Sequence, residues 1–143
     1  MHVNARSFDY DFWRGEPAAW ADKGVHWHCH LWRATADQYR NDAERRDPAS
    51  DLAPLVVQEW LRKPARFVDH VARTPEEGVA WLSRQWDGLK AKVAGAQDPP
   101  DGTRLGRALY ELRLGQGVTW GFWTLDSSHY IGLYLVVAAQ DCH

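Results

Sequence analysis

Three histidines, His26, His28 and His30, occupy every second position of the short segment 25–32, VHWHCHLW. Side chains two residues apart on a β-strand leave the same face, at intervals of roughly 6.5 to 7 Å. Two neighbouring imidazoles of such a row can share one metal ion, whereas the outer two stand roughly 13 Å apart at the backbone. His28, in the middle, belongs to either pair.

A third metal ligand has to come from another segment. Residues 7–13 also alternate, with aromatic side chains on one parity and Asp9 and Asp11 on the other. If this segment pairs with 25–32 and buries its aromatic side chains, both carboxylates lie on the histidine face. Two histidines and one aspartate suit zinc or, with open positions, ferrous iron. The candidate metal ligands are His26, His28, His30, Asp9 and Asp11.

A solvent-exposed strand face is the alternative explanation of the same pattern. Polar residues at every second position are typical of the wet side of an antiparallel sheet. A histidine opposite an aspartate is then a weak surface pair. The sequence has no HExxH motif to add weight to the metal interpretation.

The nine tryptophans of the chain supply a second hypothesis. Parity places Trp13 and Trp32 on the same face as the histidine row, and Trp123 could border a similar polar strip. Tryptophan is enriched at binding hot spots, and indoles beside polar side chains suit a ligand cleft or a protein-binding surface. We therefore predict Trp13, Trp32 and Trp123 as binding residues, with burial beneath helices as the alternative.

Strands and helices must position these residues. Alternating polarity predicts five strands, over 7–13, 25–32, 104–114, 118–125 and 129–139. The last two are apolar on both parities, which predicts central positions in the sheet.

Helices are predicted between the two groups of strands, over 36–46, 52–60, 67–71 and 75–94. The last of these has the strongest signal. Thr74, Pro75 and Glu77 match a capping box with proline at the first helical position. Its apolar stripe includes Trp86, which is predicted to be buried against the last three strands.

The predicted fold class is α+β, in the order ββ-helices-βββ. An antiparallel sheet of about five strands, open or partly closed into a barrel, is covered by two to four helices. At 143 residues, the chain is expected to form a single domain over 1–143.

Charge and cysteine content narrow the function classes. Seventeen basic and nineteen acidic residues give a net charge of −2, which argues against affinity for nucleic acid or for an anionic membrane. The sequence has two cysteines and no apolar run long enough to span a bilayer. We therefore expect a cytoplasmic protein.

Two functions follow as expectations. The first is a small protein-interaction module of the inhibitor, immunity or accessory type, which binds a protein partner through a sheet face lined by Trp, His and Asp. The alternative is a metal-dependent enzyme that acts on a small apolar or aromatic molecule, with zinc or iron held by a His/His/Asp site. The first is favoured because polar strand faces are usually not catalytic sites.

Overall fold

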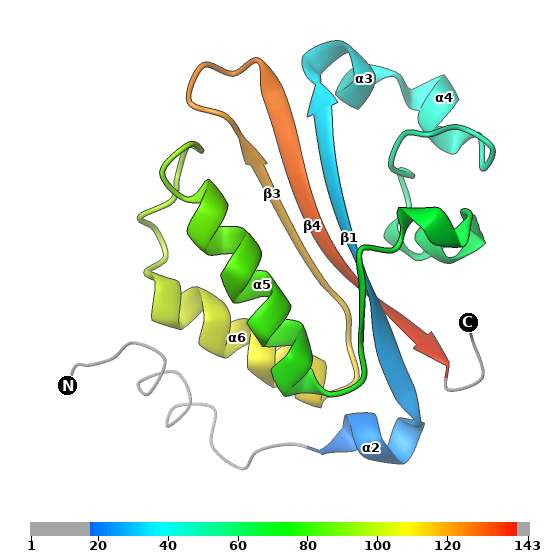
Figure 1. The fold of residues 1–143 in the computed structure, drawn as a ribbon, viewed down its shortest axis with the longest axis vertical. Coiled ribbons are helices and arrows are strands. Elements are labelled where there is room, and N and C mark those ends of the chain that lie inside the picture. The colour runs from blue at the N-terminus through cyan, green and yellow to red at the C-terminus, as the bar shows by residue number, and fades with distance from the viewer. Residues whose placement is uncertain (1–17, 140–143) are drawn as a thin grey trace.

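A four-stranded antiparallel sheet forms the centre of the computed structural model, which describes residues 18–139 (Figure 1). The strand order is β2-β1-β4-β3. The strands are β1 (Val25–Thr35), β2 (His70–Ala72), β3 (Val118–Trp123) and β4 (His129–Ala139). β1 and β4 pair along their whole length, from Val25 opposite Ala139 to Thr35 opposite His129. The two long strands therefore lie at the centre of the sheet, as expected for β4. The central position predicted for 118–125 is wrong, because β3 lies at the edge of the described sheet.

Helices and loops cover both faces of this sheet (Figure 1). The two long helices, α5 (Pro75–Leu89) and α6 (Asp101–Arg113), pack on one face. The other face is covered by the segment between β1 and β2, which contains α3 (Ala36–Arg40), α4 (Asp42–Arg46), η1 (Val57–Arg62) and η2 (Ala65–Phe67). A short helix, α2 (Ala19–Lys23), precedes β1. The α+β class is confirmed, in a three-layer arrangement.

Each face of the sheet has its own apolar core. On the α5/α6 face, Trp27 of β1 and Leu133 of β4 pack with Leu112 of α6. On the opposite face, Trp32 and Tyr134 pack with Trp60 of η1. Because both faces of β1 are covered, this strand lacks the solvent-exposed polar face of a half-buried strand. The three histidines of β1 therefore lie inside the protein, whereas Arg33 and Thr35 are exposed.

Helix α5 begins where its sequence signal predicts. The Thr74 hydroxyl accepts a hydrogen bond from the Glu77 amide at 3.1 Å, and Pro75 is the first helical residue. The helix ends at Leu89 rather than at Ala94. Gly78 allows it to approach the sheet, because a Cβ at this position would lie 2.8 Å from the Leu135 side chain.

The prediction of a strand over 104–114 is wrong, because this segment lies in helix α6. The buried residues Leu105, Ala108 and Leu112 are spaced by three and four, which places them on one helical face. Two glycines, Gly102 and Gly106, lower the intrinsic helix propensity of the segment and obscure this pattern. Both glycines are buried.

Two of the predicted helices between the strand groups are also corrected. The helix predicted over 52–60 is a loop followed by the 3-10 helix η1, and the turn predicted over 67–71 ends in strand β2. The predicted surface helix 36–46 consists of two short helices on either side of Asn41. Four strands form an open sheet within the described part of the chain; the strand predicted at 7–13 lies outside it.

No helix within residues 18–139 combines the length and the apolar character that a membrane crossing requires.

Candidate metal-binding site on strand β1

The histidine row lies on the face of β1 that is turned away from helices α5 and α6. Trp27 and Cys29 project into the α5/α6 core, so His26, His28 and His30 leave the opposite face. Their exposed fractions are 3%, 4% and 0%. The row is therefore buried, which is incompatible with a wet strand face.

The side chains of His26 and His28 converge. Their Nε2 atoms lie 3.2 Å apart, and their ring centroids are separated by 5.1 Å at an interplanar angle of 45°. In a tetrahedral zinc site with bonds of about 2.0–2.1 Å, two ligand nitrogens are about 3.3–3.4 Å apart. The observed separation therefore fits two ligands of one ion, and it also fits a single N–H···N hydrogen bond.

The protonation state of His28 suits metal coordination. Burial, together with the neighbouring His26 ring and the Arg73 guanidinium, lowers the pKa of His28 from its usual value. A neutral imidazole keeps the nitrogen lone pair that a metal requires. At neutral pH His28 is therefore in the form that can act as a ligand.

His30 is separated from the other two histidines. Its Nδ1 lies 2.8 Å from the Phe67 carbonyl oxygen, and its ring stacks on Trp60 with centroids 4.2 Å apart. Because a carbonyl only accepts, Nδ1 carries the proton and Nε2 holds a lone pair. Burial lowers the pKa of His30 to about 4. Contacts with η1 and η2 hold His30 in this position. It is therefore not a third nitrogen donor beside His26 and His28.

A small cavity opens beside His26. It has a volume of about 170 Å³, and its walls include Trp20, Gly24 and Arg73. Arg73 follows β2 directly and has an exposed side chain. The Arg73 guanidinium and His26 therefore line the same cavity. The positive charge of Arg73 favours binding of an anionic group there.

The remaining predicted metal ligands, Asp9 and Asp11, lie outside the described residues, as does Trp13. Within 18–139, no group of three or more His, Cys, Asp or Glu side chains is placed to hold a metal ion. The described part of the chain thus brings two nitrogen donors together, those of His26 and His28. Cys29 is not a third, because it lies on the opposite face and burial raises its pKa to about 12.

The two tryptophans predicted for binding that are described, Trp32 and Trp123, lie in one aromatic cluster. Trp32 is 7% exposed and contacts Tyr39, with the Arg45 guanidinium 4.9 Å from its ring centroid. Trp123 is half-buried, and Tyr130 contacts both indoles. Their binding role stays a prediction, and Trp123 is the more accessible of the two.

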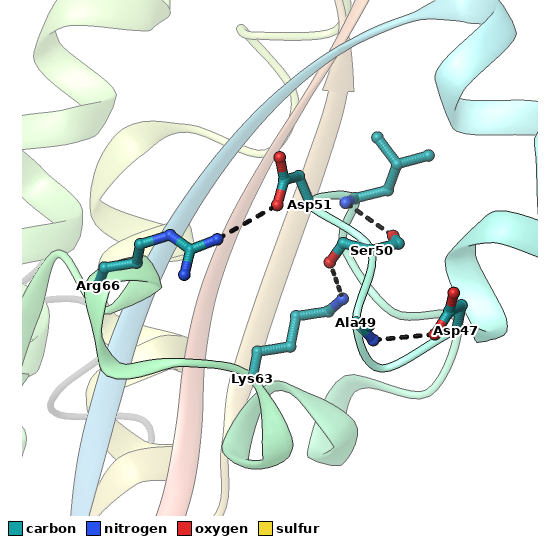
Figure 2. A network of polar contacts seen from close by, with 7 residues as sticks. Asp47, Ala49, Ser50, Asp51, Lys63 and Arg66 are labelled. Atoms are coloured by element: carbon teal, nitrogen blue, oxygen red, sulfur yellow. Dashed lines mark hydrogen bonds and ion pairs between the residues drawn. The ribbon is translucent and has the colours of Figure 1, made fainter.

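Buried cations beside this cluster were not anticipated from the sequence. Arg45 is 9% exposed, and its guanidinium donates to the carbonyl oxygens of Tyr39, Ala53 and Pro54 at 2.9 to 3.3 Å. Lys63 is 7% exposed, and its Nζ donates to the Ser50 carbonyl at 2.6 Å (Figure 2). Nothing in the spacing of these residues predicts this, because their partners are main-chain atoms of α3 and of the loop 48–56.

A Ser–His contact occurs in the turn between β3 and β4. The Ser128 hydroxyl lies 2.8 Å from His129 Nδ1 and 2.7 Å from Asp126 Oδ1. In a hydrolase triad the histidine stands between the acid and the serine. Here the serine stands between the other two, so Asp126 does not orient His129 and the turn has no triad geometry.

No protein-family model matches the chain, and comparison with curated proteins and with solved structures likewise finds no match. The function is therefore inferred from the geometry of the chain itself.

Proposed function

We propose that this protein binds a divalent transition-metal ion through the Nε2 atoms of His26 and His28, with zinc as the best fit. The 3.2 Å separation of these two atoms carries the proposal. It matches the edge of a tetrahedral site, and imidazole nitrogen is a preferred ligand of zinc. Burial favours the neutral form of His28 and so reduces the competition between protons and the metal ion.

The other ligands are proposed to come from the segment 7–13. Asp9 and Asp11 are the candidates there, because a carboxylate completes a His/His/Asp set. Ferrous iron is the second choice of metal, since two histidines and one carboxylate can leave coordination positions open. The cavity beside His26 would give a small molecule access to such a position.

Catalysis is the extension of this proposal. A metal ion with an open position can polarise a bound group or activate water. The wall of the cavity contains the Trp20 indole, which suits an aromatic or apolar substrate. A cytoplasmic location is part of the proposal, because the chain has two cysteines and the described one, Cys29, is a buried free thiol.

A protein-interaction role is the second candidate function, and it would use a surface other than the histidine face of β1. The histidines and Trp32 are each at most 7% exposed, so they cannot form a contact face in this conformation. Trp123 is partly accessible, and Leu125, two residues further along, is 68% exposed. These two side chains favour the tip of the β3–β4 hairpin as the place where a partner would bind.

Metal content distinguishes the two candidates. The chain is purified without a histidine tag, stripped with a chelator and titrated with zinc by calorimetry. We expect saturable binding by the wild type, strong loss in His26→Ala and in His28→Ala, and retention in His30→Phe, which preserves a ring against Trp60. Asp9→Ala and Asp11→Ala then identify the carboxylate ligand.

Absence of saturable binding of zinc, iron, copper or nickel by the wild type would reject the metal proposal. Equal losses in all three histidine variants would reject the assignment of His26 and His28 as the ligand pair. Circular dichroism of each variant separates loss of ligands from loss of folding.

A further inference from the structure

A second cavity, of about 430 Å³, lies between α4, the loop that follows it and η1. We call it the α4–η1 cavity. Its volume falls in the range of small-molecule sites. One wall is apolar, formed by Pro48, Pro54, Leu55 and Val56. Leu55 is 38% exposed and Val56 is 63% exposed, so this wall presents apolar surface that no described residue covers.

Another part of the wall of the α4–η1 cavity is cationic, because Arg45, Arg46 and Lys63 also line it. Glu59 is the one acidic lining residue, and its carboxylate is paired with Arg62 at 3.0 Å. The lining therefore carries more positive than negative charge. Its one acidic residue, Glu59, already pairs with Arg62, which does not line the cavity.

Lys63 is the most deeply buried amine of this wall. An ammonium group has three N–H donors, and the described residues provide one acceptor, the Ser50 carbonyl. The carboxylates of Asp47 and Asp51 attract the Lys63 charge from nearby, but their hydrogen bonds go elsewhere: as Figure 2 shows, Asp51 accepts from Arg66 and Asp47 from the Ala49 amide. A buried ammonium is stabilised by an anion that accepts its remaining hydrogen bonds.

Arg45 holds a second positive charge in a fixed position. Three main-chain carbonyls and the Trp32 and Tyr39 rings surround its guanidinium. A charge that is already in place does not have to be ordered when a ligand binds, which favours affinity. Arg46, the next residue, is exposed and can move towards a ligand.

We propose that the α4–η1 cavity binds a small amphipathic carboxylate, with its anionic group beside Lys63 and its apolar body against Leu55 and Val56. The lining supplies a partner for each half of such a molecule. The site does not involve the histidine pair, so it stands whether or not the protein binds a metal.

The test compares a carboxylate with its uncharged counterpart. Wild-type full-length protein is titrated with 4-phenylbutanoate and with 4-phenylbutanamide, and binding is followed by calorimetry and by amide chemical shifts. We expect saturable binding of the carboxylate, with shifts centred on Leu55 and Val56, and affinity at least about tenfold lower for the amide.

Variants then locate the anionic group. Lys63→Met keeps the length of the side chain and removes its charge, and it should weaken carboxylate binding by about tenfold or more. Arg46→Ala, at an exposed position, should weaken it in the same direction and does not risk the fold. The matched control is Lys92→Met, which removes the same charge from an exposed lysine after α5, and it should leave the affinity unchanged.

Three results would overturn the proposal. The first is an absence of saturable 4-phenylbutanoate binding at millimolar concentrations. The second is equal affinity for the acid and the amide, and the third is equal weakening by Arg46→Ala and Lys92→Met, because in both cases binding would not depend on the charge of this cavity.

Discussion

The indole of Trp86 and the carboxylate of Asp101 join helix α5 to the first residue of helix α6. Trp86 Nε1 donates to Asp101 Oδ1 at 2.8 Å, and Lys90 Nζ lies 2.9 Å from the other oxygen. On its other side the indole packs against Phe122 of β3, with ring centroids 4.9 Å apart. One fully buried side chain therefore connects two helices and the sheet.

Truncation of Trp86 should destabilise the protein strongly. Trp86→Ala removes a large buried side chain and should lower the free energy of unfolding by about 3 to 5 kcal/mol, measured by urea titration. Trp86→Phe retains most of the packing and removes the hydrogen bond, so its cost should be smaller. A loss below about 1 kcal/mol in Trp86→Ala would contradict the core position of this residue.

Protonation of His30 should make the folding stability depend on pH. Burial lowers its pKa to about 4 in the folded state, whereas the unfolded value is about 6.5. Between these values the unfolded chain binds more protons, so stability is complete above about pH 6.5 and falls as the pH decreases towards 4. The total loss from this residue is roughly 3 kcal/mol.

The control for His30 is His30→Phe, measured by urea titration at several pH values. This variant lacks the hydrogen bond to Phe67 and should be less stable than the wild type at neutral pH. Its stability should change less between pH 6.5 and 4. An unchanged slope would show that His30 is not the source of the acid sensitivity.

Zinc should raise the melting temperature of the wild type. A ligand that binds only the folded state stabilises it by about 2.7 kcal/mol at one hundred times its dissociation constant. His28→Gln should lose this shift, and His30→Phe should keep it. Equal shifts in all three proteins would indicate that zinc binds elsewhere.

Arg45 should be needed for the loop between α4 and η1. Arg45→Met keeps an apolar stem but leaves the Ala53 and Pro54 carbonyls without their donor, and each buried unsatisfied acceptor costs about 1 to 3 kcal/mol. We therefore expect a clear loss of thermal stability. The neighbouring Arg46→Met, at an exposed position, serves as the control and should be close to neutral.

Trp32 and Trp123 should respond differently to truncation. Trp32 is 7% exposed beneath Arg45, so Trp32→Ser should lower the melting temperature substantially. Trp123 is half-buried at the edge strand β3, and Trp123→Ser should cost less. A melting temperature within a few degrees of wild type in Trp32→Ser would instead support its predicted place on a binding surface.

Local signals account for the elements that the sequence predicted correctly. β1 and β4 follow from alternating or continuous apolar residues, and α5 follows from the capping pattern of Thr74 and Pro75. That the three histidines share one face also follows from strand geometry, but that geometry does not determine that His26 converges with His28 while His30 contacts Phe67. The alternating pattern does not show that other segments cover the histidine face. A polar residue at every second position is expected both on a solvent-exposed face and on a face that a loop covers.

The missed features depend on distant contacts. Arg45 and Lys63 hold the loop 48–56 through main-chain carbonyls, and such bonds leave no trace in side-chain spacing. Helix α6 was missed because Gly102 and Gly106 resemble turn residues until the packing that accommodates them is known. Both errors arise where tertiary contacts override local propensity.

The pairing of β1 with β4 has a consequence for the order of folding. Val25 lies opposite Ala139, so the central strand pair joins opposite ends of the described chain. During synthesis β1 leaves the ribosome early and has no partner at the centre of the sheet until β4 follows. Non-local pairing of this kind slows folding, and its unpaired strand is prone to aggregate in the interval. Expression of chains truncated before His129 should therefore yield aggregated protein rather than a smaller folded core.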